Sequence, residues 1–509
     1  MRAILGAVLI AVASGWAEER AITILHTNDI HGHVQPWRGW EGELAGKTIG
    51  GMDRLATAIQ QVRAERGVGN VLLLDAGDTL GDTMIADETE GGAVLQVMNA
   101  VAYDAMVIGN HEPDFATTKL RELIGRASFP ILAANVRDRA SGQLVTKPYV
   151  IREIGGVKIG ILGLAYPNTA LTTAKKNVAT VDFLDIPPIA RELVPKMRGE
   201  GAQIIVALTH YGLSADMKLA QSAPGIDVIV GGHSHNRVTP AIEIGTTLIV
   251  QAGAHCSDLG RLDLTVKEGR VTKHESRLIS LDHAAIASDP ETAKLIESLV
   301  APLKEKLDEP VAIADVLIAR AQTLSGARPR KRDEESPADS LFADILREET
   351  KADIAALPGV GYGVAIQPGA FTAAALRNLI PHQSKVVTLK LTGAQIREIL
   401  EQSIENTYTD DPVKKVGGMI QVSGLTLRYD PKGTFGMRII EAKVNEDALA
   451  PERSYLVATN SMLAEGGHNY RTFLDGRDRQ ELGGQYEMVK AAMHKRGHPA
   501  TPASGRISK

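Results

Sequence analysis

Short apolar runs alternate with amphipathic stretches through the first half of this chain of 509 residues. The alternation extends from Ala21 to about Leu278, and Met52–Arg66 and Thr117–Ile124 have the spacing of amphipathic helices. The apolar runs are rich in β-branched residues and comprise Ile22–Leu25, Val71–Leu74, Ala105–Ile108, Ile159–Leu162, Ile204–Ala207 and Val228–Val230. Such runs are typical of strands in sheets that helices cover on both faces. We therefore predict an α/β fold for this half.

A second α/β region follows Ser325–Glu335, a segment rich in Gly, Pro and charge. The basic residues of this segment could contact a phosphate, although a solvated linker is the preferred interpretation; they are Arg328, Arg330, Lys331 and Arg332. Beyond it we predict helices at Glu335–Thr350 and Thr392–Ile404, and strands at Lys385–Leu391, Leu425–Tyr429 and Tyr455–Thr459. The last dozen residues are polar, and we expect them to be frayed.

The N-terminus has the pattern of a secretory signal peptide. Arg2 supplies a charge, Ala3–Ala13 is an apolar run too short to span a bilayer, and Ala17 precedes two acidic residues as a cleavage point. No later run reaches the roughly eighteen apolar residues of a membrane span. We therefore expect a leader at residues 1–17, a periplasmic or secreted protein, and no membrane span.

The charge balance bears on the class of partner. The formal net charge is -5, whereas a protein that binds a nucleic acid polymer would be strongly basic. A small anionic substrate fits this balance if bound metal supplies the cations. The single cysteine, Cys256, cannot form an internal disulfide, and we expect it to be a small buried residue.

Polar motifs with metal-ligand residues directly follow five of the apolar runs. In chain order they contain Asp29 and His31, then Asp78, then Asn110 and His111, then His210, and finally His233 and His235. One histidine at a strand end is more often a loop or capping residue than a ligand. Five such motifs in the same topological place are improbable by chance, because ligand groups gather at the carboxyl ends of strands in α/β sheets. The pattern predicts a metal centre.

The number of ligands indicates two ions. A single cation takes four to six ligands, whereas the motifs offer seven side chains: Asp29, His31, Asp78, Asn110, His210, His233 and His235. Asp78 is the candidate bridge, since a carboxylate has two oxygens. Two divalent cations about 3.5–4 Å apart suit the hydrolysis of phosphate esters. The mixed nitrogen and oxygen ligands suit zinc, manganese, cobalt or iron without choosing among them.

His111 is the predicted catalytic residue. Its neighbour Asn110 already serves as a ligand, so an imidazole at this point could stabilise the transition state or protonate the leaving oxygen. Asp114, three residues further on, would orient His111 and keep it charged. The alternative is that His111 only supports the ligands.

These five motifs resemble the metallophosphoesterase superfamily. In the second half, Glu335–Leu341, Thr388–Ile399, Gly418–Gly424 and Asn460–Tyr470 resemble the 5′-nucleotidase family, which includes periplasmic UDP-sugar hydrolases. The resemblance implies a four-layer αββα catalytic domain at 18–334, a linker helix at 335–351 and a C-terminal α/β substrate-binding domain at 352–509. It also assigns one ion to Asp29, His31, Asp78 and His235, the other to Asp78, Asn110, His210 and His233, and the catalytic pair to His111 and Asp114.

The substrate pocket departs from the family pattern. The family's phosphate-binding arginine has no counterpart in Pro358–Gly363, which is mostly glycine. The family stacks the base between two aromatic rings; Tyr470 fits one ring position, and Met419 occupies the other. We expect both to contact the substrate; the alternative for Tyr470 is plain core packing.

The preferred hypothesis is an exported dimetal phosphoesterase that hydrolyses nucleotides by metal-activated water, with UDP-sugars and cyclic nucleotides among the candidate substrates. One alternative is a hydrolase of a non-nucleotide ester, similar to thiosulfate-ester hydrolases. The intact Gly109–Glu112 motif is more similar to nucleotidases. Another alternative is a catalytically silent ligand-binding protein, which would have no use for His111 and Asp114.

Overall fold

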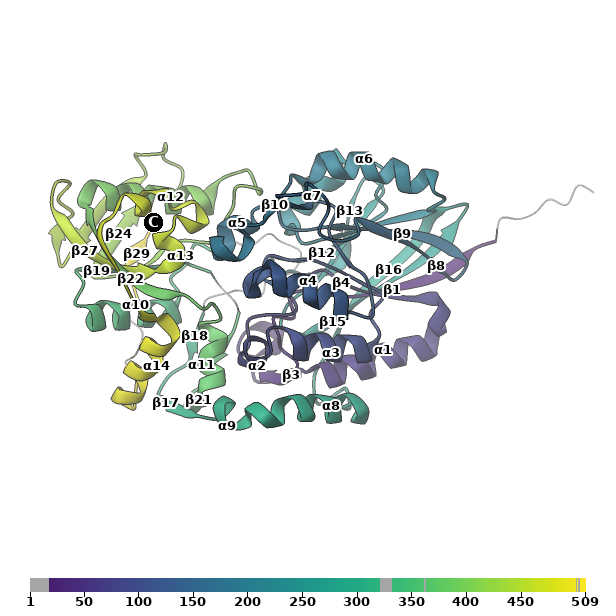
Figure 1. Ribbon diagram of the computed structural model, residues 1–509, viewed down its shortest axis with the longest axis horizontal. Coiled ribbons are helices and arrows are strands. Elements are labelled where there is room, and N and C mark those ends of the chain that lie inside the picture. Colours follow the sequence, from purple (N-terminus) through teal and green to yellow (C-terminus); the bar gives the residue numbers. More distant parts are fainter. Residues whose placement is uncertain (1–17, 321–331, 361–362, 500, 502–503) are drawn as a thin grey trace, which may run out of the picture.

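Two domains lie side by side in the computed structural model (Figure 1). It describes residues 18–320, 332–360, 363–499, 501 and 504–509. The predicted leader at 1–17 and most of the predicted linker at Ser325–Glu335 lie outside the described residues. The first domain runs from purple to teal in Figure 1, and the second is green to yellow.

The first domain is built on two six-stranded sheets. One has the order β16-β15-β1-β4-β5-β6, with β1 (Arg20–Thr27), β4 (Val71–Asp75), β5 (Ala105–Val107), β6 (Ile131–Leu132), β15 (Asp258–Lys267) and β16 (Arg270–Ser280). The other has the order β13-β14-β12-β11-β9-β8, with β8 (Tyr149–Ile154), β9 (Val157–Leu164), β11 (Ile204–Thr209), β12 (Val228–Gly231), β13 (Arg237–Ile244) and β14 (Thr247–Ala252). The central strands of each sheet are parallel, so their carboxyl ends share one edge.

The central strands have apolar side chains on both faces because each sheet packs against the other sheet on one face and against helices on the other. Side chains such as Ile24, Leu74, Ile161 and Val206 meet in a core between the two sheets. Helices α1 (Met52–Arg66), α3 (Gly92–Val101), α4 (Ala116–Arg126) and α8 (Pro290–Val300) contribute to the core outside the first sheet. Helices α6 (Ile186–Gly199) and α7 (Leu213–Ser222) cover the second. The predicted four-layer αββα sandwich is confirmed.

Shorter elements complete the first domain. They are the paired strands β2 (Pro36–Arg38) and β3 (Thr48–Gly50), the pair β7 (Val136–Asp138) and β10 (Val181–Phe183), and helices α2 (Met84–Glu88), α5 (Thr169–Thr172) and α9 (Lys304–Leu307). Cys256 is buried as expected, with 2% of its surface exposed.

The second domain has a five-stranded sheet between two layers of helices. Its order is β23-β19-β27-β22-β28, with β19 (Ile354–Leu357), β22 (Lys385–Thr392), β23 (Gln421–Ser423), β27 (Ser454–Asn460) and β28 (Arg477–Gly484). One apolar core includes helices α10 (Pro337–Thr350), α11 (Ala373–Leu379) and α14 (Gln485–Arg496), and another includes α12 (Gly393–Tyr408) and α13 (Ser461–Ala464). The predicted elements of this half are therefore present.

Local sequence explains where α12 starts. The Thr392 hydroxyl accepts a hydrogen bond from the Gln395 amide at 3.3 Å, and the Gln395 side chain accepts one from the Thr392 amide at 2.8 Å. This capping box satisfies two amides that a helix start leaves without partners. The helix therefore begins at the point that the sequence predicts.

Strand pairing differs from the predicted boundary at residue 334. Strand β17 (Pro310–Ala314) pairs with β21 (Gly369–Thr372), and β18 (Ile318–Ala319) pairs with β20 (Ala365–Ile366). Residues 310–319 are thus tied to the second domain. The prediction placed the boundary there because the resemblance starts the linker helix at Glu335, but the start of a helix does not show the partner of a strand that precedes it.

The expectation that the last dozen residues are frayed is wrong for their final part. Strand β29 (Ile507–Ser508) pairs with β24 (Leu425–Tyr429) in a four-stranded sheet that also contains β25 (Ile439–Val444) and β26 (Asp447–Ala448). The Arg506 guanidinium donates to both carboxylate oxygens of Asp344 at 2.8 Å. Both bonds come from Nη2, and charge-assisted contacts of this kind offset the entropy of ordering a polar terminus.

Direct hydrogen bonds join the two domains. The Arg377 guanidinium in α11 donates to Asp87 in α2 at 2.7 Å, and the Trp40 indole donates to the Gly363 carbonyl at 2.9 Å.

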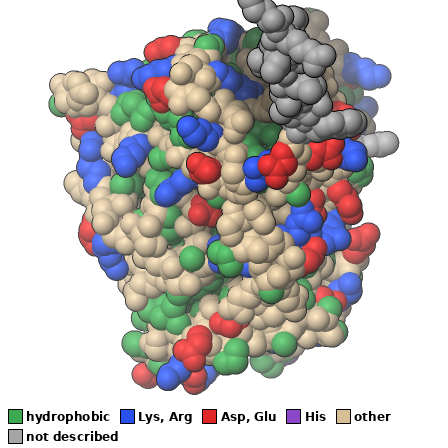
Figure 2. Space-filling model, turned by 90° about the vertical axis from the view of Figure 1, so that its right-hand side faces the viewer, with side chains coloured by type: hydrophobic (Ala, Val, Ile, Leu, Met, Phe, Trp, Pro, Cys, Tyr) green, Lys and Arg blue, Asp and Glu red, His purple; other side chains and the backbone are tan. Residues whose placement is uncertain are grey.

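On the face drawn in Figure 2, acidic and basic side chains are interspersed rather than gathered by sign. Within the described residues, no helix has both the length and the apolar character needed to cross a membrane.

Replacing Arg506 by alanine should destabilise the second domain by about 1–3 kcal/mol, because Asp344 then loses its charged partner in a partly buried site. Urea denaturation followed by circular dichroism measures this change. Arg428 is exposed on the adjacent strand β24 and provides a matched control, since its alanine variant should unfold like the wild type. Equal stability of the two variants would contradict the anchoring role of Arg506.

Candidate metal centre and active site

The predicted ligands come together at the carboxyl ends of five strands, on the side of the first domain that faces the second (Figure 1). Strands β1, β4 and β5 of one sheet and β11 and β12 of the other end there. Six of the seven side chains are at least 95% buried: Asp29, His31, Asp78, Asn110, His210 and His235. His233 is partly buried. Two sheets thus contribute to one polar cluster.

Many of these side chains sit on backbone that L residues rarely adopt. Positive φ angles, between 49° and 72°, occur at Asp29, His31, Asp78, His233 and His235. Such a conformation occurs in a few per cent of non-glycine residues and concentrates at functional sites. Asp82 and His255, which the motifs do not single out, share it with φ of 79° and 56°. The loops are therefore bent to aim these side chains inward.

One group of ligand atoms surrounds Asp29. His31 Nε2 lies 3.0 Å from His235 Nε2 and 3.7 Å from Asp29 Oδ1, and His235 Nε2 lies 3.3 Å from the same oxygen. Ligand atoms of Asp29, His31 and Asp78 all lie within 4.8 Å of one another. This set matches the first predicted ion.

A second group adjoins the first and shares Asp78. His210 Nε2 lies 2.9 Å from Asp78 Oδ2, and His233 Nδ1 lies 2.8 Å from Asn110 Oδ1. Asp78, His210 and His233 offer ligand atoms within 4.8 Å of one another. The structure thus brings all seven predicted ligands together, with Asp78 between the two groups.

The donor atoms suit cations. The Ala76 carbonyl accepts from His210 Nδ1 at 2.7 Å, so His210 Nε2 is the nitrogen that faces the cluster. His210 Nε2 is buried and lies 2.9 Å from Asp78 Oδ2, so a metal between the two groups could take both as ligands. Although burial opposes its charge, the Asp78 carboxylate raises the pKa of His210 to about 9. A bound cation would take the place of that proton.

Two glycines allow the loops to approach so closely. At Gly77, where φ is 87°, a Cβ atom would lie 2.7 Å from the Gly109 amide nitrogen. At Gly232 a Cβ would lie 2.7 Å from the Ala76 carbonyl and 2.9 Å from His210 Nδ1. A side chain at Gly77 would push apart the loops that carry Asp78 and Asn110, and one at Gly232 would push the ligands of the two sheets apart.

Glu112 is a functional residue that the motif analysis did not assign. Its fully buried carboxylate accepts backbone amides of Gly109 at 2.6 Å, Thr79 at 2.8 Å and Asp78 at 3.0 Å. The Leu80 amide adds a fourth bond at 3.2 Å. Glu112 therefore fixes the loop of Asp78 against the loop of Asn110. Its place inside the third motif was the available signal.

The predicted catalytic pair is in hydrogen-bond contact. His111 Nδ1 lies 2.8 Å from Asp114 Oδ2, and the Thr173 hydroxyl also donates to Asp114. His111 Nε2 lies 4.0 Å from Asp78 Oδ2, beside the ligand cluster. Burial opposes protonation, but the carboxylates of Asp82, Asp78 and Asp114 raise the pKa of His111 well above its ordinary value. The pair can therefore present a proton at Nε2.

The second domain closes the pocket over this cluster. His382 stacks on His111 with ring centroids 5.0 Å apart and planes 13° from parallel. Arg332 lines the same pocket, together with Val360, Gly417 and His468. Arg332 belongs to the segment for which a solvated linker was the preferred interpretation, so that interpretation does not hold for this residue. No motif in the sequence marks His382, whereas His468 lies within Asn460–Tyr470, which resembles the 5′-nucleotidase family, without being assigned a role.

Met419 and Tyr470 do not reach this pocket. Both side chains are fully buried in the apolar core of the second domain. The Ser403 hydroxyl donates to Met419 Sδ at 3.1 Å, and the Tyr470 hydroxyl donates to the Gly418 carbonyl at 3.2 Å. A ring or thioether without exposed surface cannot stack on a base, so this geometry does not support the expected substrate clamp.

Comparison with known proteins agrees with this architecture. The calcineurin-like phosphoesterase family model matches residues 22–237, and the model of the 5′-nucleotidase C-terminal domain matches residues 314–475. The fold and site thus define a metallophosphoesterase. The chain has a calcineurin-like phosphoesterase domain followed by a 5′-nucleotidase C-terminal domain, and it is a metal-dependent phosphoric ester hydrolase similar to the 5′-nucleotidases.

Individual proteins show how far the likeness extends. The chain is 28% identical to the trifunctional nucleotide phosphoesterase protein YfkN of Bacillus subtilis, over 96% of this chain but only 35% of that longer protein. A 5′-nucleotidase precursor from Thermus thermophilus superposes with a TM-score of 0.87 at 26% identity, covering 96% of this chain and 99% of that one. The sulfate thiohydrolase SoxB of Thermus thermophilus superposes with a TM-score of 0.86 at 24% identity, covering 96% of each, and shares the fold.

Replacing Glu112 by glutamine should lower metal content and destabilise the first domain by about 1–3 kcal/mol, because the amide nitrogen turns one acceptor of backbone amides into a donor. Mass spectrometry of bound metal and thermal denaturation measure the two effects. Glu122→Gln, on the exposed side of α4, is the matched control and should behave like the wild type. Wild-type metal content in Glu112→Gln would contradict the positioning role.

Proposed function

We propose that this chain is an exported two-metal phosphoesterase that hydrolyses nucleotides. The observation that carries the proposal is the convergence of seven ligand side chains on two adjoining groups that share Asp78, beside a hydrogen-bonded His111–Asp114 pair. Two-metal sites of this composition suit in-line displacement at phosphorus. The two family models that match the chain support the same reaction class.

The residues of the proposed centre divide between two ions. Asp29, His31 and His235 would hold one ion, Asn110, His210 and His233 the other, and Asp78 would bridge them. Bound divalent cations supply an activated water and stabilise the charge that develops on the phosphoryl oxygens. Zinc, manganese, cobalt and iron all fit these nitrogen and oxygen donors.

The protein's own groups handle the leaving group. We assign to His111 the donation of a proton from Nε2 to the departing alkoxide, since Nδ1 is held by Asp114. Asp114 accepts from both His111 and Thr173, which fixes the orientation of the imidazole. The amide of His111 also donates to Asp78 Oδ1 at 2.7 Å, so the acid and the proposed bridge are held together.

Arg332 is the proposed contact for the substrate phosphate. It lines both the pocket over the ligands and an adjoining groove that includes Tyr166, Lys415 and Asn406. A guanidinium at this junction offers the charge-assisted hydrogen bonds that the glycine-rich Pro358–Gly363 stretch does not. The groove is also lined by the proposed ligand His233, and it is the proposed place of the nucleoside.

A second candidate is the hydrolysis of a small anionic ester that carries no base, such as a thiosulfate ester. The burial of Tyr470 and Met419 favours it. Among the described residues that line the pocket over the ligands, none is Phe, Tyr or Trp.

Export is proposed from the pattern of Arg2, Ala3–Ala13 and Ala17.

Replacing His111 by alanine should leave both ions bound and lower kcat on the order of 10²-fold or more, because the leaving oxygen loses its acid. Asp78→Asn should instead lose metal, since the proposed bridge is weakened. Steady-state kinetics and metal analysis of the two variants separate these outcomes. His274→Ala, on strand β16, is the control and should retain both properties. Loss of metal in His111→Ala would contradict its assigned role.

A substrate panel tests the specificity. AMP, ATP, UDP-glucose, a cyclic nucleotide, bis-p-nitrophenyl phosphate and a thiosulfate ester are compared with each candidate metal. Preference for a nucleotide supports the first proposal, and hydrolysis of only a non-nucleotide ester supports the second. Absence of hydrolysis with every metal would contradict both.

Replacing Arg332 by alanine should raise KM for the preferred anionic substrate about ten-fold or more, because a charge-assisted hydrogen bond contributes roughly 1.5–3 kcal/mol. Initial-rate kinetics over a range of substrate concentrations measure the change. Lys414→Ala, which removes an exposed cation of the second domain, is the matched control. An unchanged KM in Arg332→Ala would contradict the assigned contact.

A further inference from the structure

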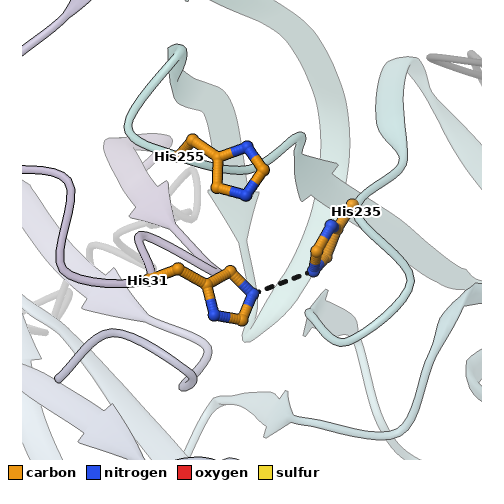
Figure 3. A group of neighbouring side chains, drawn as sticks. All are labelled: His31, His235 and His255. Carbon is orange, nitrogen blue, oxygen red and sulfur yellow. Dashed lines mark hydrogen bonds between the residues drawn. The ribbon is translucent and has the colours of Figure 1, made fainter. Parts of the chain in front are cut away.

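A third histidine stands beside the pair that faces Asp29. Figure 3 shows His255 next to His31 and His235, on the loop that follows β14. The ring centroid of His255 lies 5.6 Å from each of the other two. Its side chain is 96% buried, so the three imidazoles share one enclosed space. Neither the motifs nor the family resemblance assigns a role to His255.

The backbone of His255 has the same features as that of the predicted ligands. Its φ angle is 56°, against 49° at His31 and 55° at His235. The amide of His255 donates to the carbonyl of Asp29 at 2.7 Å, which ties its loop directly to a ligand residue. A buried, non-glycine residue held in this conformation indicates a constraint imposed by function.

The spacing of the nitrogen atoms suits a single ion. One ring nitrogen from each of His31, His235 and His255 lies within 4.8 Å of the others. Two imidazoles on the same ion, each at about 2.1 Å, stand at most about 4.2 Å apart. The ring nitrogens of the three histidines are at most 4.8 Å apart. A bound cation would therefore need to draw two of them together by no more than about half an ångström.

We infer that His255 is a further ligand of the ion proposed at Asp29, His31 and His235, an inference that rests on the proposed two-metal site. The addition makes this position richer in imidazole than the one at His210 and His233. Imidazole favours zinc, cobalt and iron, whereas carboxylate and carbonyl oxygens suit manganese and magnesium. The two ions therefore differ in identity or in exchange rate.

A packing role is the competing explanation. The His255 ring also lies 4.6 Å from the His33 ring and 5.8 Å from the Trp37 ring. Two substitutions separate the two roles. His255→Phe keeps an aromatic ring and removes both nitrogens, whereas His255→Gly removes the whole side chain and suits a positive φ angle.

The experiment measures metal stoichiometry and metal release in the full chain. Wild-type protein loaded with zinc should retain two ions after gel filtration. Both His255 variants should lose one of the two ions to a chromogenic chelator about ten-fold faster or more, because this is the range seen when even a ligand's hydrogen-bond partner is removed. His283→Phe, a partly buried histidine bonded to Gly50, is the matched control and should match the wild type.

Each other outcome overturns the inference. If His255→Phe releases the ion at the wild-type rate, whatever the effect of His255→Gly, the ring has a packing role. If any folded His255 variant holds two ions and releases both at the wild-type rate, His255 is not a metal ligand. If the wild type holds fewer than two ions, the ion position proposed at Asp29, His31 and His235 is absent. Turnover of bis-p-nitrophenyl phosphate is measured separately. A wild type that binds two ions but hydrolyses no ester contradicts the proposed function and leaves the His255 inference standing.

Discussion

The placement of the Asp78 carboxylate is the constraint on which the site depends. It lies between two groups of candidate ligands, each of which takes side chains from both sheets, and its backbone is held at a positive φ angle of 55°. Glu112 secures the Asp78 loop by accepting its amides, and Gly77 allows the neighbouring loop to approach. Buried charge of this kind is costly unless it is paired or bound to metal. Stability and metal binding are therefore coupled here.

The second domain determines how enclosed the chemistry is. His382 covers His111, and Arg332 lies where the pocket over the ligands meets the interdomain groove. A closed site strengthens the electrostatic effect of each charge by excluding water. The interdomain bond between Arg377 and Asp87 holds α11, which precedes the His382 loop, against the first domain. Substrate specificity thus depends on surfaces that the metal ligands do not define.

The local pattern of the chain predicted much of the fold. Strand runs such as Val71–Leu74 and the Thr392 capping box depend on neighbours in sequence, and both are where the pattern places them. The pairing of β29 with β24 was not predicted, because a two-residue strand carries no apolar signal and depends on a partner far along the chain. Met419 and Tyr470 show the same limit, since matching a family's ring positions does not determine which side chains are exposed.

The sequence by itself predicted the seven candidate ligand side chains and the His111–Asp114 pair, and the structure brings them together, because each follows an apolar run and parallel strands bring their carboxyl ends to one edge. Only the tertiary structure decided which other residues share that space. His255, His382 and Arg332 lie in loops or linkers whose positions depend on packing between sheets and between domains. Short spacings in a chain encode side-chain direction along one element, and they do not encode the distance between elements far apart in sequence.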